Sequence, residues 1–171
     1  AFGYEHPAER VLAFLKYIPA CFSSLFQIAY LHTRWKLGST ELVRPEKLYS
    51  TCNLKEILEV FVRSFSDYVY SRPQLNKTLM CPSCEVIKRV YAPNERLKAL
   101  LRKKNPSQLQ NLTLELISLF SSASSVPFED FGVHGSIALG METDQSDMDL
   151  VVYGKENFRR LEAAVNKLLD E

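Results

Sequence analysis

The stretch FGVHGSIALGMETDQSDMDLVVYG, residues 131–154, decides the fold of the C-terminal part of the chain. Within it, Gly135 and Ser136 follow a short apolar segment. Because glycine has no Cβ, backbone N–H groups at such a turn can approach an anion closely, and the N-terminus of a following helix attracts negative charge. The turn therefore predicts a phosphate-binding site that could hold a triphosphate.

Two aspartates follow in the same stretch, Asp147 and Asp149. On a strand, residues at i and i+2 point to one face, so both carboxylates would share a face while Met148 and Leu150 face the other side and can be buried. Magnesium prefers hard oxygen ligands and commonly takes one or two carboxylates, with phosphates and waters completing its shell. The pair predicts a site for Mg²⁺ or Mn²⁺, and the whole arrangement fits phosphoryl or nucleotidyl transfer.

The spacing of these residues is G-S-x₁₀-D-x-D, with Ser146 just before the first aspartate and the apolar run Leu150-Val151-Val152 after the second. This pattern resembles the signature of the DNA polymerase β-like nucleotidyltransferase superfamily. More widely, the sequence resembles an archaeal-type group of predicted nucleotidyltransferases, which carry a β-rich N-terminal part ahead of the transferase core. This wider resemblance covers about half of the chain and is carried by residues 90–101, by residues 131–154 and, more loosely, by residues 4–19.

The resemblance implies roles for four residues. Ser136 and the backbone N–H groups beside Gly135 would bind the phosphates of a nucleoside triphosphate, ATP included, and Asp147 and Asp149 would be the catalytic residues that hold two divalent ions. The activity implied is transfer of a nucleotide to an unidentified hydroxyl acceptor. The family also places a third carboxylate on a strand after the next helix, and an arginine shortly after the Gly-Ser pair. This chain ends at Glu171, where that strand would be due, so we expect a fragment of a longer protein.

Several alternatives compete with the transferase interpretation. The chain could be a non-catalytic nucleotide- or RNA-binding regulatory module that keeps the transferase fold. A calcium loop starting at Asp144 lacks the glycine and the glutamate that such loops need. The aspartates could instead form an ordinary turn into a strand, with Ser146 or Asp147 capping backbone groups. His134 could contact a phosphate or a base, or be a structural histidine.

Charge is balanced overall but uneven along the chain. The formal net charge of +1 gives no global field for nucleic acid or acidic membranes, whereas residues 85–104 carry seven basic and two acidic residues, a net charge of +5. Residues 129–171 carry ten acidic and four basic residues, a net charge of −6. The basic segment could bind RNA or a triphosphate, or both segments could simply solvate their helices.

The apolar stretch 11–31 is interrupted by Lys16, Pro19 and Gln27, so we expect no membrane span and a cytoplasmic location. Cys81 and Cys84 form a lone C-x-x-C pair, and a structural zinc site usually needs a second pair. The cysteines are therefore expected to be reduced, partly buried thiols, with zinc binding as the alternative. The oligomeric state is open.

Periodicity and turn residues predict an α+β protein. Its two parts are a β-rich region with helices over residues 1–105, of unknown role, and the start of a polymerase β-like nucleotidyltransferase α/β core over residues 106–171. Asn53 offers a cap for the first helix. The expected elements are a hairpin of strands 10–18 and 26–35, a helix over 54–70, a loop over 72–85, a strand over 86–91, helices over 95–104 and 106–123, a strand over 131–134, a short helix, a strand over 148–153 and a helix over 155–169.

Overall fold

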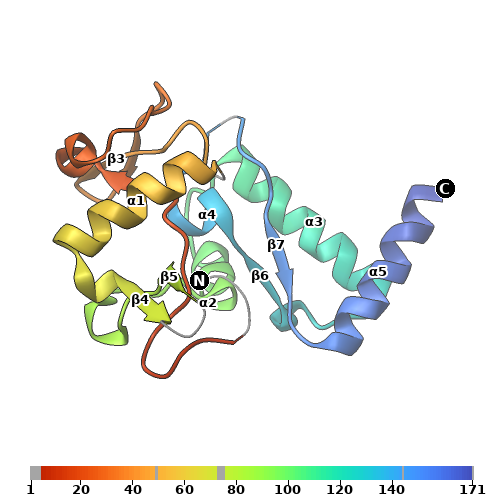
Figure 1. The fold of residues 1–171 in the computed structure, drawn as a ribbon. Coiled ribbons are helices and arrows are strands. Elements are labelled where there is room, and N and C mark those ends of the chain that lie inside the picture. The colour runs from red at the N-terminus through yellow and green to blue at the C-terminus, as the bar shows by residue number, and fades with distance from the viewer. Residues whose placement is uncertain (1–4, 49, 73–75, 144, 171) are drawn as a thin grey trace. The chain divides into compact units, whose positions relative to one another are not determined.

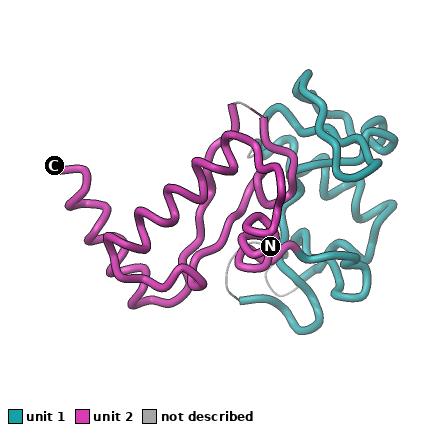
Figure 2. The backbone as a smooth tube through the Cα atoms, turned by 180° about the vertical axis from the view of Figure 1, so that it is seen from behind, with its two compact units in different colours: residues 1–90 teal, residues 91–171 magenta. Residues whose placement is uncertain are grey.

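The computed structural model describes residues 5–48, 50–72, 76–143 and 145–170. The chain forms two compact units, unit 1 over residues 1–90 and unit 2 over residues 91–171 (Figure 2). The units divide at 90/91 rather than at the predicted 105/106, because helix α2 (Pro93–Leu101) packs against strand β6 (Phe131–Val133) of unit 2. Helices and small antiparallel sheets occur together, so the fold is α+β (Figure 1).

Unit 1 contains a three-stranded antiparallel sheet in the order β1-β3-β2. Its strands are β1 (Ile18–Pro19), β2 (Trp35–Leu37) and β3 (Thr40–Val43). Gly38 has a φ of +61° in the tight turn between β2 and β3, a conformation that glycine adopts without strain. The hairpin predicted from 10–18 and 26–35 is therefore wrong: the hairpin lies farther along the chain, and residues Ala20–Leu25 form a 3₁₀ helix.

The rest of unit 1 is helix α1 (Thr51–Ser64) followed by a second hairpin, β4 (Val69–Arg72) and β5 (Lys77–Met80). The cap of α1 is Ser50, whose Oγ accepts a hydrogen bond from the N–H of Asn53 at 3.4 Å, so Asn53 is not the cap. The loop predicted over 72–85 is wrong, because β5 lies within it. The strand predicted over 86–91 is also wrong: Cys84–Val86 form a 3₁₀ helix and no strand follows before α2.

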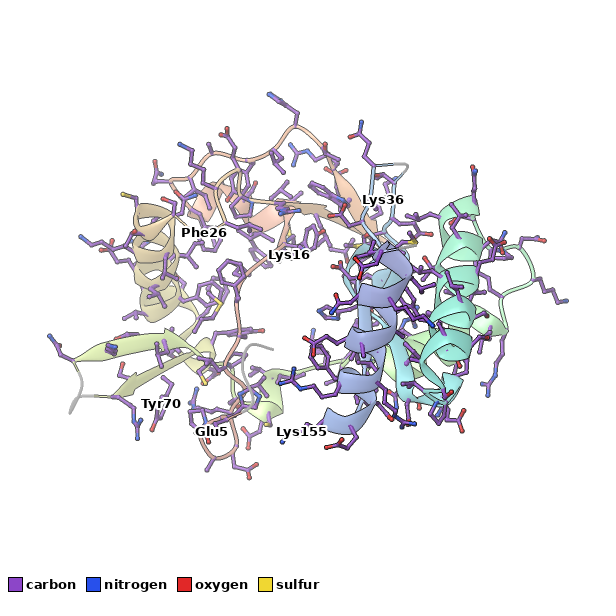
Figure 3. All side chains as sticks on the ribbon, turned by 90° about the vertical axis from the view of Figure 1, so that its right-hand side faces the viewer. Glu5, Lys16, Phe26, Lys36, Tyr70 and Lys155 are labelled. Carbon is purple, nitrogen blue, oxygen red and sulfur yellow. The ribbon has the colours of Figure 1, made fainter. Side chains whose placement is uncertain are left out.

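The core of unit 1 lies between α1 and the two hairpins. Phe26, which is labelled in Figure 3, lies with its ring centroid 6.0 Å from that of Phe61 in α1. The cluster consists of seven buried residues: Ile18, Phe26, Val43, Ile57, Val60, Phe61 and Met80. Burial of apolar side chains from β1, β3, β5 and α1 thus holds the two small sheets and the helix together.

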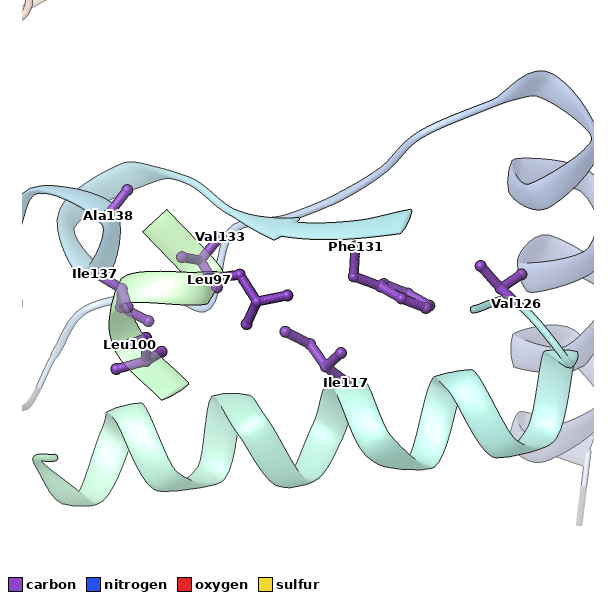
Figure 4. Close-up of a cluster of buried hydrophobic side chains, with 8 residues drawn as sticks. All are labelled: Leu97, Leu100, Ile117, Val126, Phe131, Val133, Ile137 and Ala138. Atoms are coloured by element: carbon purple, nitrogen blue, oxygen red, sulfur yellow. The ribbon is translucent and has the colours of Figure 1, made fainter. Parts of the chain in front are cut away.

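Unit 2 runs α2, α3 (Gln108–Ser124), β6, α4 (Gly135–Leu139), β7 (Leu150–Val152) and α5 (Lys155–Asp170). Strands β6 and β7 pair antiparallel, with Val133 opposite Leu150. Figure 4 shows the core side chains of β6 facing those of α3, with Leu97 and Leu100 contributed by α2. The predicted helices over 106–123 and 155–169 and the predicted strands over 131–134 and 148–153 are confirmed, with shifted ends.

Among the helices that the described residues form, none combines the length and the apolar character that crossing a membrane requires.

Candidate phosphate and metal site in unit 2

The turn after β6 places Gly135 directly against the carboxylate of Asp149. Gly135 has a φ of +61°, and a Cβ built on it would overlap Asp149 Oδ2 and lie 2.9 Å from Asp149 Cγ. The N–H of His134 donates to the carbonyl oxygen of Asp149 at 2.8 Å, which continues the β6–β7 pairing by one step. The structure therefore brings Asp149 to the turn at Gly135. The backbone angle favours glycine at this position, and a larger residue would displace the Asp149 carboxylate.

Helix α4 fixes the other end of this turn. Its residues Ile137 and Ala138 are buried in the core of unit 2, and Gly140 ends the helix with a φ of +66°. The N–H of Met141 donates to the carbonyl oxygen of Ser136 at 2.9 Å, as in the closing bonds of many helix ends. Because α4 has only five residues, any anion binding here depends on local N–H groups rather than on a helix dipole.

Asp147 and Asp149 are both exposed. Met148 is 38% exposed, so its predicted burial is wrong, whereas Leu150 packs partly buried against the core. The physical reason is that β7 begins only at Leu150, so the alternation of a paired strand does not reach back to Met148. Both carboxylates are therefore accessible to a ligand from solvent.

Thr143 and Ser146 are joined by two hydrogen bonds in the turn that leads into the aspartates. The N–H of Thr143 donates to Ser146 Oγ at 2.9 Å, and the N–H of Ser146 donates back to the carbonyl oxygen of Thr143 at 2.9 Å. Ser146 thus caps backbone groups in this turn, as one of the alternatives predicted. Asp144, the first residue of the calcium-loop alternative, lies outside the described residues, as does Glu171.

The donor chemistry at this site suits a hard cation that is shared with a phosphate. Magnesium usually keeps several waters and takes only one or two carboxylates from protein. Within the described residues, no three His, Cys, Asp or Glu side chains are grouped so that they could hold a metal ion. Asp147 and Asp149 are exposed carboxylates, the type of ligand that Mg²⁺ or Mn²⁺ would accept together with a nucleotide and water.

A polar cluster around the buried Gln110 joins the loop after α4 to the start of α3, and it was not predicted from the sequence. Glu142 Oε1 accepts hydrogen bonds from Gln110 Nε2 at 2.5 Å and from Ser107 Oγ at 3.2 Å, while its Oε2 is buried without a partner. Ser107 and Gln110 also form a capping box at the N-terminus of α3. A negative charge there is favoured by the helix dipole. The Ser-x-x-Gln spacing was the signal that could have found it.

The basic segment 85–104 is divided between the two units, and several of its cations have partners inside unit 2. Arg96 donates from Nε to the carbonyl oxygen of Ala138 at 2.5 Å, and its guanidinium lies 5.5 Å from the centroid of the Tyr91 ring. Lys98 pairs with Glu95 at 2.8 Å, and this hydrogen bond lowers the pKa of Glu95. Lys103 donates to Gln110 Oε1 at 2.8 Å. These contacts reduce the number of charges that the segment offers to an outside polyanion.

The four cysteines are free thiols, of which Cys81 is buried and Cys21, Cys52 and Cys84 are exposed. Burial raises the pKa of the Cys81 thiol, an effect that the charge of Arg10 partly opposes. Arg10 donates hydrogen bonds to three backbone carbonyl oxygens, those of Asp67, Val69 and Cys81. The cysteines were expected to be partly buried, whereas one of the four is buried and three are exposed.

Comparison with known proteins gives a single distant relative to report. No family model matches the chain, and no solved structure matches it significantly. The chain is 24% identical over 170 residues to the uncharacterized protein MJ1086 of Methanocaldococcus jannaschii, with 98% of this chain and 47% of that protein covered. The chain therefore spans about half the length of this curated relative, whose name states no activity.

Proposed function

We propose that the chain carries the nucleotide- and metal-binding part of a Mg²⁺-dependent nucleotidyltransferase, and that residues 106–171 begin a polymerase β-like core. The observation that carries the proposal is the packing of Gly135 against the Asp149 carboxylate. This contact supports a shared site because a phosphate at the turn and a cation on the carboxylate would be neighbours. The order β6, turn, α4, β7, α5 agrees with the core that the sequence resembles.

In this proposal, backbone N–H groups beside Gly135 and the hydroxyl of Ser136 bind the β- and γ-phosphates of a nucleoside triphosphate. Asp147 and Asp149 would hold divalent cations, which would neutralise charge on the phosphates. The oxygen of the acceptor hydroxyl forms a new bond to the α-phosphorus and gives its proton to solvent water, while the bond from that phosphorus to the pyrophosphate oxygen breaks and pyrophosphate leaves. The protein contributes position and electrostatics, and it forms no covalent intermediate with the nucleotide.

The proposal is tested by calorimetric titration of the chain with each nucleoside triphosphate in the presence of Mg²⁺ or Mn²⁺. We expect binding that requires the metal. The double substitution Asp147→Asn/Asp149→Asn removes both charged ligands, so it should weaken binding by at least about tenfold, or roughly 1.4 kcal/mol. The experiment measures binding rather than turnover, because the resemblance implies that catalysis also needs a third carboxylate on a strand after α5.

The matched control is Glu156→Gln/Asp170→Asn, which removes two exposed acids of α5 and changes the net charge by the same amount. This control variant should bind nucleotide as the unchanged chain does. If the unchanged chain shows no metal-dependent binding, or if both double variants bind equally well, the proposed site is wrong.

A further inference from the structure

The three-stranded sheet of unit 1 carries two partly exposed aromatic side chains on the face away from the core. Trp35 of β2 lies opposite Leu42 of β3, whereas the next residue of β3, Val43, belongs to the core cluster. Because side chains alternate along a strand, Trp35 points to the other face. Tyr17 meets it there, with ring centroids 5.3 Å apart and planes at 64°. The two rings lie outside the buried cluster of unit 1, on the same face as the buried Leu42.

Exposed cations lie close to this aromatic pair in space or in the sequence. Lys16 Nζ lies 5.8 Å from the centroid of the Tyr17 ring, and Arg34 and Lys36 flank Trp35 in the sequence (Lys16 and Lys36 are labelled in Figure 3). Since β2 is an edge strand of the sheet, long side chains on it can reach solvent on either side. Residues 16–47 hold five basic and two acidic residues, a net charge of +3.

The nearest acid neutralises this surface only weakly. Arg34 Nε lies 3.9 Å from Glu41 Oε1, and both side chains are more than half exposed. Such a surface ion pair contributes little and is easily exchanged for another partner. By contrast, Arg96 and Lys103 of the basic segment donate to the carbonyl oxygen of Ala138 and to the buried Gln110. The cations near Trp35 are therefore more available to a polyanion than Arg96 and Lys103 are.

We propose that this surface, defined by Lys16, Tyr17, Arg34, Trp35 and Lys36, binds a single-stranded polynucleotide. Aromatic rings on a sheet provide platforms on which bases stack, and flanking cations bind the phosphates that follow along the strand. A purely apolar protein partner would gain nothing from the positive charge, whereas a polynucleotide uses both the rings and the cations. The inference goes beyond the proposed transferase site and does not depend on it, because every residue named belongs to unit 1.

Trp35 is the single tryptophan of the chain, so its fluorescence reports on the surface directly. We expect quenching when the whole chain is titrated with oligouridylate or with oligothymidylate of about 12 nucleotides, a length within the range of single-strand binding sites. With about three phosphates neutralised, affinity should fall roughly 15-fold between 50 and 200 mM salt. Binding of either oligonucleotide supports the proposal, and a preference between them identifies RNA or DNA as the partner.

Variants locate the contact, with binding followed by the fluorescence anisotropy of a labelled oligonucleotide. Trp35→Leu should weaken binding about tenfold because the stacking ring is lost, and Trp35→Phe should retain most of the affinity. Lys16→Gln/Arg34→Gln should lower the steepness of the salt dependence, because two phosphate contacts disappear. The matched control, Lys98→Gln/Arg102→Gln, removes the same charge from unit 2 and should bind normally.

Three results would overturn the proposal: no quenching with either oligonucleotide, equal binding by the Trp35→Leu variant, or an equal loss in the unit 2 control. Circular dichroism of each variant establishes that it is folded. If Trp35→Leu does not fold, the lower salt dependence expected of Lys16→Gln/Arg34→Gln remains the test, and an unchanged salt dependence in that variant would overturn the proposal. The Asp147→Asn/Asp149→Asn variant should bind the oligonucleotide as the unchanged chain does. Failure of the transferase proposal is therefore distinguishable from failure of this one.

Discussion

Gly135 and Gly140 bracket helix α4, and both have a positive φ, but only one of them touches an aspartate. A Cβ at Gly135 meets the Asp149 carboxylate, whereas nothing lies within 4 Å of a Cβ at Gly140. The overlap involves the outer atoms of an exposed side chain, which can turn away at little cost. The two positions therefore separate backbone strain from displacement of the carboxylate.

We expect Gly135→Ala and Gly140→Ala to lower the free energy of unfolding by similar amounts, about 1–2 kcal/mol, because alanine is strained at positive φ. Only Gly135→Ala should also abolish metal-dependent nucleotide binding, since it moves the Asp149 carboxylate. Urea denaturation measures the first effect and calorimetric titration the second. Normal nucleotide binding by Gly135→Ala, or an equal loss in Gly140→Ala, would contradict this explanation.

Residue spacing predicted the neighbourhood of Gly135 and Asp149 but not the surroundings of the site. The motif implied that the turn and the aspartates meet, and the structure places Asp149 against the turn at Gly135. The exposure of Met148 could not be predicted in this way, because it depends on where the pairing of β7 with β6 ends. The contact of Glu142 with Ser107 and Gln110 joins residues more than thirty positions apart, and only the folded chain defines such contacts.

At the scale of elements, the start of α3 is held by one hydroxyl with two functions. Ser107 Oγ accepts from the N–H of Gln110 at 3.3 Å and donates to Glu142 Oε1 at 3.2 Å. The first bond satisfies an N–H group that the helix leaves unpaired, and the second ties the loop after α4 to this helix end. The cap is therefore a structural support of the loop that leads to Asp147.

Ser107→Ala should lower the free energy of unfolding by about 1–2 kcal/mol, because both hydrogen bonds are lost. Ser107→Thr keeps the hydroxyl and should recover most of that stability. Both variants are compared with the unchanged chain by chemical denaturation. An equal loss in the alanine and threonine variants would mean that the hydroxyl is not what stabilises the helix end.

The helices were predictable here because their signals are local, whereas the strands of unit 1 were not. The apolar period of α3 and α5 shows in the sequence, and both helices form close to the expected residues. The segment 10–18 looks equally apolar and was expected to pair with residues 26–35. Instead, the N–H groups of Val11 and Ala13 donate to the carbonyl oxygens of Pro82 and Met80. A strand needs a partner from elsewhere in the chain, so its position depends on tertiary structure.

The second hairpin of unit 1 shows the same limit. Residues 72–85 contain Pro73 and Pro82, which suggested a loop, but the pairing runs over Val69–Arg72 and Lys77–Met80. Pro82 follows the last paired residue of β5, and Pro73 lies outside the described residues. Helix α1 ends at Ser64 because Phe65 leaves the helical conformation, with Ser66 and Asp67 following in a 3₁₀ turn. Serine and aspartate favour helix ends over helix interiors. The predicted helix over 54–70 did not take this preference into account.

At the scale of the whole molecule, each unit has its own buried cluster, and the chain between them has no regular structure. Residues 87–92 form neither helix nor strand, and Val90 is 77% exposed. The two hydrophobic clusters share no residue. Two separate cores joined by an irregular exposed segment are the features of a boundary between units that a protease can reach.

Limited digestion with trypsin tests this division, because Lys88 and Arg89 lie in the segment and are both exposed. The first cut is expected after one of them, since cleavage there requires neither cluster to open, whereas a cut inside a unit requires local unfolding. Mass spectrometry should then find two fragments that meet at residue 88 or 89 and resist further digestion. In Lys88→Gln/Arg89→Gln the intact chain should persist several times longer. A first cut elsewhere, or an unchanged rate in that variant, would show that the segment is protected and that the two clusters unfold as one.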